Sequence, residues 1–77
     1  MAKVFILVNA NIAKLRNVFE DVRKIDGIEK ANMVTGAYDV IAIAETKEIE
    51  EVTEKIIEKI GEIDGVKGTT TSVVTGE

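Results

Sequence analysis

Runs and stripes of apolar residues divide the first third of the chain into a strand and a helix. Residues 3–9 carry five consecutive apolar, mostly β-favouring residues between polar ones, which predicts a strand covered on both faces. From Asn11, a favourable N-cap, apolar residues recur every three or four positions as far as Ile25, which predicts an amphipathic helix. Its stripe, expected in the core, comprises Ile12, Leu15, Val18, Phe19, Val22 and Ile25.

The middle of the chain predicts a hairpin followed by a second helix. Residues 28–35 and 38–44 are predicted to be strands, with a tight turn at Gly36-Ala37 between them. Thr46 is expected to cap the following helix, and Glu48 and Glu50 suit its first turn. The apolar stripe of this helix comprises Ile49, Val52, Ile56, Ile60 and Ile63.

A final strand over residues 66–75 completes the order βαββαβ. This order predicts a single α+β domain over residues 1–77 with the ferredoxin-like plan, an antiparallel sheet with two helices on one face. The chain also repeats itself, because the segment 24–28 recurs as the segment 62–66 with Ile-Asp-Gly in both. The repeated glycine is interpreted as a helix end rather than as part of a ligand site.

The apolar strands predict a partner. With both helices on one side, the other face of the sheet stays open, and neither residues 4–8 nor residues 40–43 offer a polar side chain for it. A chain of 77 residues buries only about 60–65% of its unfolded surface, and it has no cysteine or histidine to reinforce so small a core. We expect sheet-to-sheet pairing into a dimeric α+β barrel, although a further domain or an amphipathic partner would cover the face equally well.

Composition excludes several classes of function. Without cysteine or histidine the chain has no thiolate nucleophile, imidazole base or soft metal ligand, so no catalytic residue, metal or cofactor is expected. Fourteen acidic against ten basic residues give a net charge of −4, which disfavours direct binding to nucleic acid. The apolar run at the N-terminus is too short to span a membrane, and a cytoplasmic location is expected.

Polar groups concentrate at the predicted hairpin and along the last strand. Residues 35–39 combine a hydroxyl, a phenol, a carboxylate and backbone amides freed by Gly36, which suits a small zwitterion. A hairpin turn with Tyr38 at a subunit contact explains them as well. The hydroxyl run over residues 69–72 fits either a ligand wall or a solvated edge strand. Tyr38 and Asp39 are the sole plausible acid–base pair in the sequence, and an enzyme is the least favoured alternative.

Two motifs carry a resemblance to a known family. They are Thr35-Gly36-x-Tyr38-Asp39 and Gly65-Val66-x-x-Thr69-x-Thr71. With the surrounding pattern, the whole chain resembles the effector-binding (RAM) domain of Lrp/AsnC transcription regulators. The resemblance implies an amino-acid-binding module that forms homodimers and then octamers or other rings of dimers. It also implies a stand-alone RAM protein without the helix-turn-helix domain, acting by co-assembly with full-length regulators.

The resemblance also implies where a ligand would lie. The family holds its effector between dimers, near the hairpin turn and the last strand. The matching positions are Gly36, Ala37, Tyr38 and Asp39 on one side and Thr69, Thr71, Val73 and Val74 on the other. Asp39 or backbone atoms would meet the amino group. Ala37 departs from the family, whose turn often has a polar or acidic residue there. A changed ligand preference and an assembly-only role with no ligand therefore both stay open.

Overall fold

The predicted strands pair into a single antiparallel sheet. The computed structural model describes residues 2–76, the side chain of residue 53 excepted, and within them the sheet has four strands in the order β2-β3-β1-β4. The strands are β1 (Ala2–Ala10), β2 (Ile28–Met33), β3 (Val40–Thr46) and β4 (Val66–Val73). All neighbouring strands are antiparallel, with β1 between β3 and β4. The ferredoxin-like α+β fold predicted from the sequence is confirmed.

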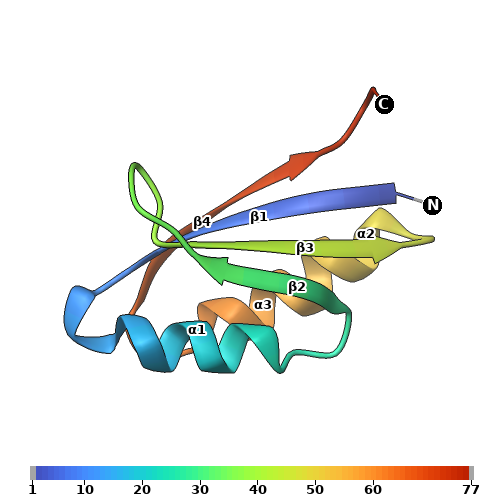
Figure 1. Cartoon of the computed structure of the whole chain (residues 1–77). Helices are drawn as coiled ribbons and strands as arrows, with labels where there is room; N and C mark the ends of the chain where they lie inside the picture. The colour runs from blue at the N-terminus through green and yellow to red at the C-terminus, as the bar shows by residue number, and fades with distance from the viewer. Residues whose placement is uncertain (1, 77) are drawn as a thin grey trace.

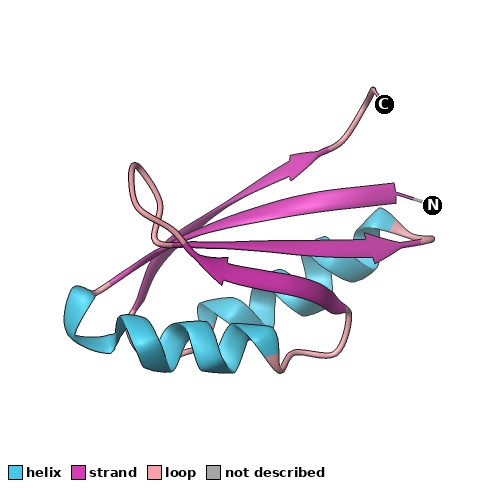
Figure 2. Ribbon diagram, in the orientation of Figure 1, coloured by secondary structure: helices cyan, strands magenta, loops and turns pink. Residues whose placement is uncertain are grey.

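The helices lie together on one face of this sheet (Figures 1 and 2). The first begins with a 3₁₀ turn, η1 (Ile12–Lys14), and continues as α1 (Leu15–Arg23). The second is continuous but changes its winding twice, from α2 (Ile49–Glu51) through the π-helical η2 (Val52–Ile56) to α3 (Ile57–Gly61). In the described part of the chain, no helix is both long and apolar enough to cross a membrane.

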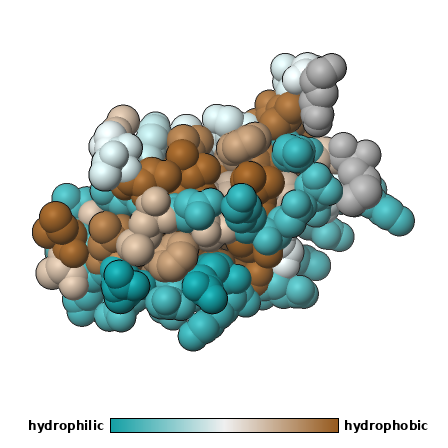
Figure 3. All heavy atoms as spheres, in the orientation of Figure 1, coloured by the Kyte–Doolittle hydropathy of each residue, from teal (hydrophilic) through white to brown (hydrophobic). Residues whose placement is uncertain are grey.

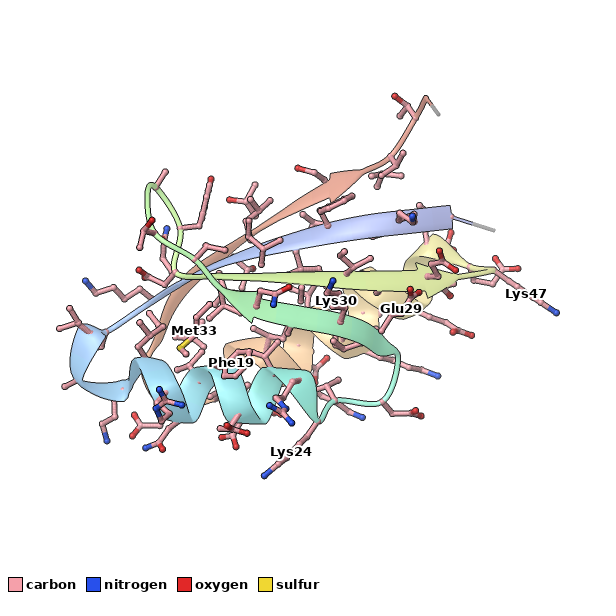
Figure 4. The ribbon with its side chains drawn as sticks, in the orientation of Figure 1. Phe19, Lys24, Glu29, Lys30, Met33 and Lys47 are labelled. Atoms are coloured by element: carbon pink, nitrogen blue, oxygen red, sulfur yellow. The ribbon has the colours of Figure 1, made fainter. Side chains whose placement is uncertain are left out.

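The core fills the space between the sheet and the helices. Every second residue of β1 and β3 points into it, because side chains alternate between the faces of a strand. The buried apolar side chains are Val4, Ile6, Val8, Ala10, Val18, Val22, Val40, Ala42, Ala44, Val52, Ile56 and Ile60. Figure 4 shows Phe19 and Met33 between α1 and the sheet. The guanidinium of Arg23 lies 5.5 Å from the ring centre of Phe19 and covers it from the solvent side.

The opposite face of the sheet carries a second apolar set, which we call the open-face block. Its members are the cross-strand partners Phe5 with Ile43 and Leu7 with Ile41. All of them are partly exposed, and none packs against the core. The upper half of Figure 3 shows apolar residues gathered over the strands, whereas the helices below present mostly hydrophilic residues. The prediction of an apolar open face is confirmed.

Three local predictions were wrong. Ile12 does not join the core but is 87% exposed, because the tighter 3₁₀ winding of η1 does not continue the stripe of α1. Thr46 is not the cap of the second helix but the last residue of β3, paired with Ala2. Its hydroxyl still accepts a hydrogen bond from the N–H of Glu48, the residue in the N-cap position, at 3.2 Å.

The third wrong prediction is the tight turn at Gly36-Ala37. Residues 34–39 form a longer loop, closed by a 2.9 Å hydrogen bond from the Val34 N–H to the Asp39 carbonyl. Tyr38 and Asp39 therefore belong to the loop and not to β3. The reason is that the chain reverses between Val34 and Asp39, which leaves six residues in the connection instead of two, while the Asp39 N–H donates to the carbonyl of Val8 on β1 at 2.9 Å.

The repeated Ile-Asp-Gly segments form the same turn after each of the two helices. Gly27 and Gly65 have φ angles of 103° and 102°, which favour glycine strongly. After Gly27 the N–H of Ile28 donates to the carbonyl of Ile25 at 3.1 Å, and the turn at Gly65 repeats this bond at 3.2 Å. Each glycine also packs against the helix of the other half of the chain. The left-handed conformation predicted for both glycines is confirmed, but each glycine lies in a turn four residues after the last helical residue, Arg23 or Gly61, and not at the helix end itself.

The π-helical segment accounts for a difference in length between the helices. The N-cap positions Asn11 and Glu48 are 37 residues apart, whereas the helix ends Arg23 and Gly61 are 38 residues apart. The second helix therefore holds one residue more than the first between cap and end. A π-helical turn accommodates such an extra residue without rotating the rest of the helix out of phase. Ile56 and Ile60 thus stay on the buried side.

The three glycines with positive φ predict a graded series of alanine variants. Gly36→Ala meets no described atom within 4 Å, so it carries the backbone cost alone, about 1–2 kcal/mol. At Gly27 an added Cβ would lie 2.8 Å from the flexible end of Ile56. At Gly65 it would collide with the Cβ of Lys14, next to that residue's backbone, and add about 1–3 kcal/mol.

Urea unfolding at one fixed protein concentration measures this series. We expect the free energy of unfolding to fall most for Gly65→Ala, less for Gly27→Ala and least for Gly36→Ala. Equal losses at the three positions would show that contacts between the halves contribute nothing beyond backbone conformation.

Candidate ligand-binding site

Asp39 fastens the loop 34–39 to the end of β1. Its Oδ2 accepts a hydrogen bond from the N–H of Ala10 at 2.8 Å, and its own N–H donates to the carbonyl of Val8. These bonds lie beside the bulge that interrupts the β1–β4 pairing at Asn9 and Ala10. Figure 1 shows the loop projecting from that end of the sheet. The carboxylate thus satisfies a backbone donor that the irregular pairing leaves available.

Tyr38 extends from the same loop across β1 toward β4. Its hydroxyl lies 3.3 Å from Oγ1 of Thr70, to which it donates a long hydrogen bond. Thr70 is paired with Leu7 of the open-face block, so the two side chains point to the same side of the sheet. The phenol therefore lies on the border of the apolar open face.

The tip of the loop is open to solvent. Gly36 and Ala37 are both exposed, and Gly36 has a φ of 117°. No described atom lies within 4 Å of the position that a Cβ would take at Gly36. A ligand could approach this part of the backbone without meeting a side chain.

The predicted residues of the last strand divide between the two faces. Thr69, Thr71 and Val73 are paired with Val8, Ile6 and Val4, whose side chains point into the core. They therefore lie on the helix side, away from Tyr38. Val74 follows the strand, where its N–H donates to the carbonyl of Lys3 at 2.9 Å, at the end of β1 opposite the loop.

Thr70, whose hydroxyl accepts the hydrogen bond from Tyr38, was not among the predicted ligand residues. A run of hydroxyl residues looks the same in either register, and a shift by one position exchanges the faces. The alternation of side chains along β1 could have identified Thr70. Leu7 points to the open face, and a residue paired with Leu7 must point to the same face. Within a single subunit the structure thus brings together Gly36, Ala37, Tyr38, Asp39 and Thr70.

This cluster offers groups for binding rather than for proton transfer. The phenol and the carboxylate are hydrogen-bonded to different partners, Thr70 and Ala10, and not to each other. A carboxylate, hydroxyls and accessible backbone amides suit the ammonium and carboxylate ends of a small ligand. Among the described residues no group of three or more acidic side chains is placed to hold a metal ion.

Comparison with known proteins shows one consistent family. The family model of the Lrp/AsnC ligand binding domain matches residues 3–77. An uncharacterized HTH-type transcriptional regulator of Pyrococcus horikoshii, PH0140, is 38% identical over 71 residues, which cover 92% of this chain and 45% of the relative. The chain thus spans about half the length of the regulators that it matches.

Solved structures show the same fold. The crystal structure of TTHA0845 from Thermus thermophilus has a TM-score of 0.91 at 23% identity, covering 100% of this chain and 96% of that one. The complex of the transcriptional regulator NMB0573 with L-Met, from Neisseria meningitidis, has a TM-score of 0.83 at 23% identity. The superposition covers 99% of this chain and 51% of the Neisseria chain.

The bond between Asp39 and Ala10 predicts a difference between two variants. Asp39→Ala leaves the N–H of a buried residue without its acceptor, at a cost of about 1–3 kcal/mol. Asp39→Asn keeps an oxygen at that position, and we expect a smaller loss. Urea unfolding and amide hydrogen exchange at Ala10 measure the effect. Exchange at Ala10 that stays as slow in Asp39→Ala as in the unmodified chain would contradict the anchoring role.

Proposed function

Because this chain belongs to the Lrp/AsnC ligand-binding domain family, we propose that it binds a small amino acid and assembles into oligomers that serve transcription regulators. The observation that carries the proposal is the position of the loop 34–39. It holds a carboxylate and a phenol at the border of an apolar sheet face that none of the helices described in residues 2–76 covers (Figure 1).

The groups at the loop match the two ends of an amino acid. The carboxylate of Asp39 would attract the ammonium group, and the exposed backbone at Gly36 and Ala37 would receive the carboxylate. Methionine is bound in the complex of the Neisseria regulator that shares this fold, which supports a free amino acid as the ligand. The residue that the ligand's side chain meets would decide which amino acid is preferred.

The open-face block supports assembly by sheet-to-sheet pairing. Phe5, Leu7, Ile41 and Ile43 form two adjacent cross-strand pairs at the centre of the face. Burying apolar area against a second copy contributes roughly 25 cal/mol per Å². A symmetric dimer is the commonest way to cover a face of this kind. The resulting dimeric α+β barrel would be the unit from which octamers or other rings of dimers form.

The predicted ligand residues support a site completed by a neighbouring subunit. In one subunit Val73 and Val74 lie at the opposite end of β1 from the loop. They could contribute to the same ligand site only from another copy, together with Thr69 and Thr71. We therefore propose that the ligand lies between subunits, so that binding changes the stability of the assembly.

The relatives suggest how such a module would act on transcription. They are named HTH-type transcriptional regulators and are about twice the length of this chain. The proposed action is indirect, through co-assembly with full-length regulators, since the net charge of −4 disfavours binding to nucleic acid.

One observation favours a second candidate, an assembly protein without a ligand. Two polar side chains of the loop already have partners inside the subunit, Asp39 with Ala10 and Tyr38 with Thr70. The loop is therefore held in place without a ligand. Assembly through the open-face block would proceed in the same way.

Leu7→Asp tests the assembly. The change replaces an apolar contact worth about 1.5–3 kcal/mol by a charge, and in a symmetric dimer the loss counts twice. We expect the dissociation constant of the dimer to rise at least about a hundredfold. Light scattering behind a sizing column at several concentrations measures the mass. Asn17→Asp on the exposed side of α1 is the matched control. A monomeric unmodified chain would refute assembly.

Calorimetry with the common amino acids tests the ligand. We expect at least one to release or absorb heat, and Asp39→Asn to weaken its binding about tenfold by removing the charge that faces the ammonium group. Asp21→Asn, which removes an exposed charge on α1, should leave the affinity unchanged. If no amino acid gives heat while the dimer persists, the assembly-only candidate replaces the ligand proposal.

A further inference from the structure

A small cavity lies at the other end of β3 from the loop 34–39. It has a volume of about 220 Å³ and opens between the turn after α1 and the second helix. Among its lining residues are Asp26, Thr46, Glu51, Lys55, Ile56 and Lys59. This volume is below the roughly 300–1,000 Å³ of sites for drug-sized molecules, and it suits a ligand the size of a free amino acid.

The internal repeat shows what this cavity lacks. At the equivalent turn of the second half, the ammonium of Lys14 lies 2.8 Å from Oδ2 of Asp64 and lowers the pKa of that carboxyl. Lys14 and Val18 also pack directly against Gly65. The side chain of Lys14 therefore covers that turn.

The turn of the first half has no equivalent ion pair among the described residues. The starts of the two helices are 37 residues apart, so Glu51 stands where the second turn uses Lys14, and this exposed acidic side chain cannot form an ion pair with Asp26. Gly27 is approached by Ile56 alone, the counterpart of Val18. Within residues 2–76, Asp26 has no ion pair. The difference between the halves leaves a carboxylate on the wall of an open cavity.

Two lysines of the second helix line the same cavity as Asp26. Lys55 belongs to the π-helical segment η2 and Lys59, four residues on, to α3. Neither has an ion pair in the described part of the chain. The other acidic residues of the wall do have partners: Glu45 lies 3.8 Å from Lys3, and Glu51 accepts a hydrogen bond from Thr46 at 3.3 Å.

We propose that this cavity is a second binding site for a free amino acid, contained within one subunit. Lys55 and Lys59 would hold the carboxylate of the ligand, and Asp26, with Glu51 beside it, would hold the ammonium group. Gly27 and Ile56 would lie against its side chain. A zwitterion pairs with both signs of charge on this wall, whereas an inorganic anion would leave Asp26 facing a like charge.

The winding of the second helix supports the assignment. η2 contributes Lys55 and Ile56 to the cavity, and single π-helical turns are frequent at functional sites. The extra residue that η2 accommodates belongs to the half of the repeat that keeps the cavity open. The site is independent of the loop 34–39 and of subunit pairing.

Titration of the ¹⁵N-labelled chain with glycine, L-alanine and L-glutamate tests the proposal. We expect saturable shifts of the amide signals of Gly27, Thr46 and Lys55. The double variant Lys55→Gln/Lys59→Gln should weaken the binding that these signals report about tenfold or more. The control Lys24→Gln/Lys67→Gln removes the same charge from exposed positions outside the cavity and should leave it unchanged. Figure 4 shows Lys24 pointing into solvent.

Three outcomes would overturn the proposal. The first is that none of the three amino acids shifts the signals of Gly27 and Thr46. The second is that the amino acids bind with equal affinity, as these signals report it, to the two double variants. The third is that inorganic phosphate binds as tightly as the amino acids and that Asp26→Asn does not weaken amino-acid binding. The cavity would then be a site for anions in general. Signals of Tyr38 and Thr70 report on the loop 34–39 separately, so the two ligand proposals can fail independently.

Discussion

The alternation of side chains along β1 and β3 is the constraint on which the rest of the molecule depends. Both strands are apolar at successive positions, yet only every second side chain can reach the helices. Val4, Ile6 and Val8 build the core, while Phe5 and Leu7 must point the other way. A chain with helices on one face only therefore carries two apolar surfaces, and a single subunit can bury just one of them.

The turns that follow the two helices have the same backbone but different surroundings. Each helix is followed by a turn whose glycine has a positive φ and packs against the helix of the other half. In the second half the ion pair of Lys14 with Asp64 closes the turn from outside. In the first half the acidic Glu51 stands where that lysine would be, and the turn has no such ion pair among the described residues. A duplicated framework has thus produced one sealed turn and one with a cavity beside it.

The loop that connects β2 to β3 also bonds the other two strands, β1 and β4, at one end of the sheet. Asp39 bonds the backbone of β1, and Tyr38 reaches Thr70 on β4. The polar side chains of the loop are therefore structural anchors as well as candidate ligand groups. A ligand that competes for Asp39 would loosen the bond to Ala10, so binding at the loop and the conformation of the β1 end are linked.

The sequence by itself determined the order of the elements, the left-handed glycines that follow the helices and the apolar open face, because each depends on residue type and periodicity along a local segment. Only the tertiary structure decided that Thr70, and not Thr69 or Thr71, accompanies Tyr38, since a run of hydroxyls reads alike in either register. It also decided that Asp39 bonds Ala10, because a backbone N–H has no signature in the sequence. The cavity beside Asp26 depends on how two distant segments pack, which periodicity along one segment does not specify.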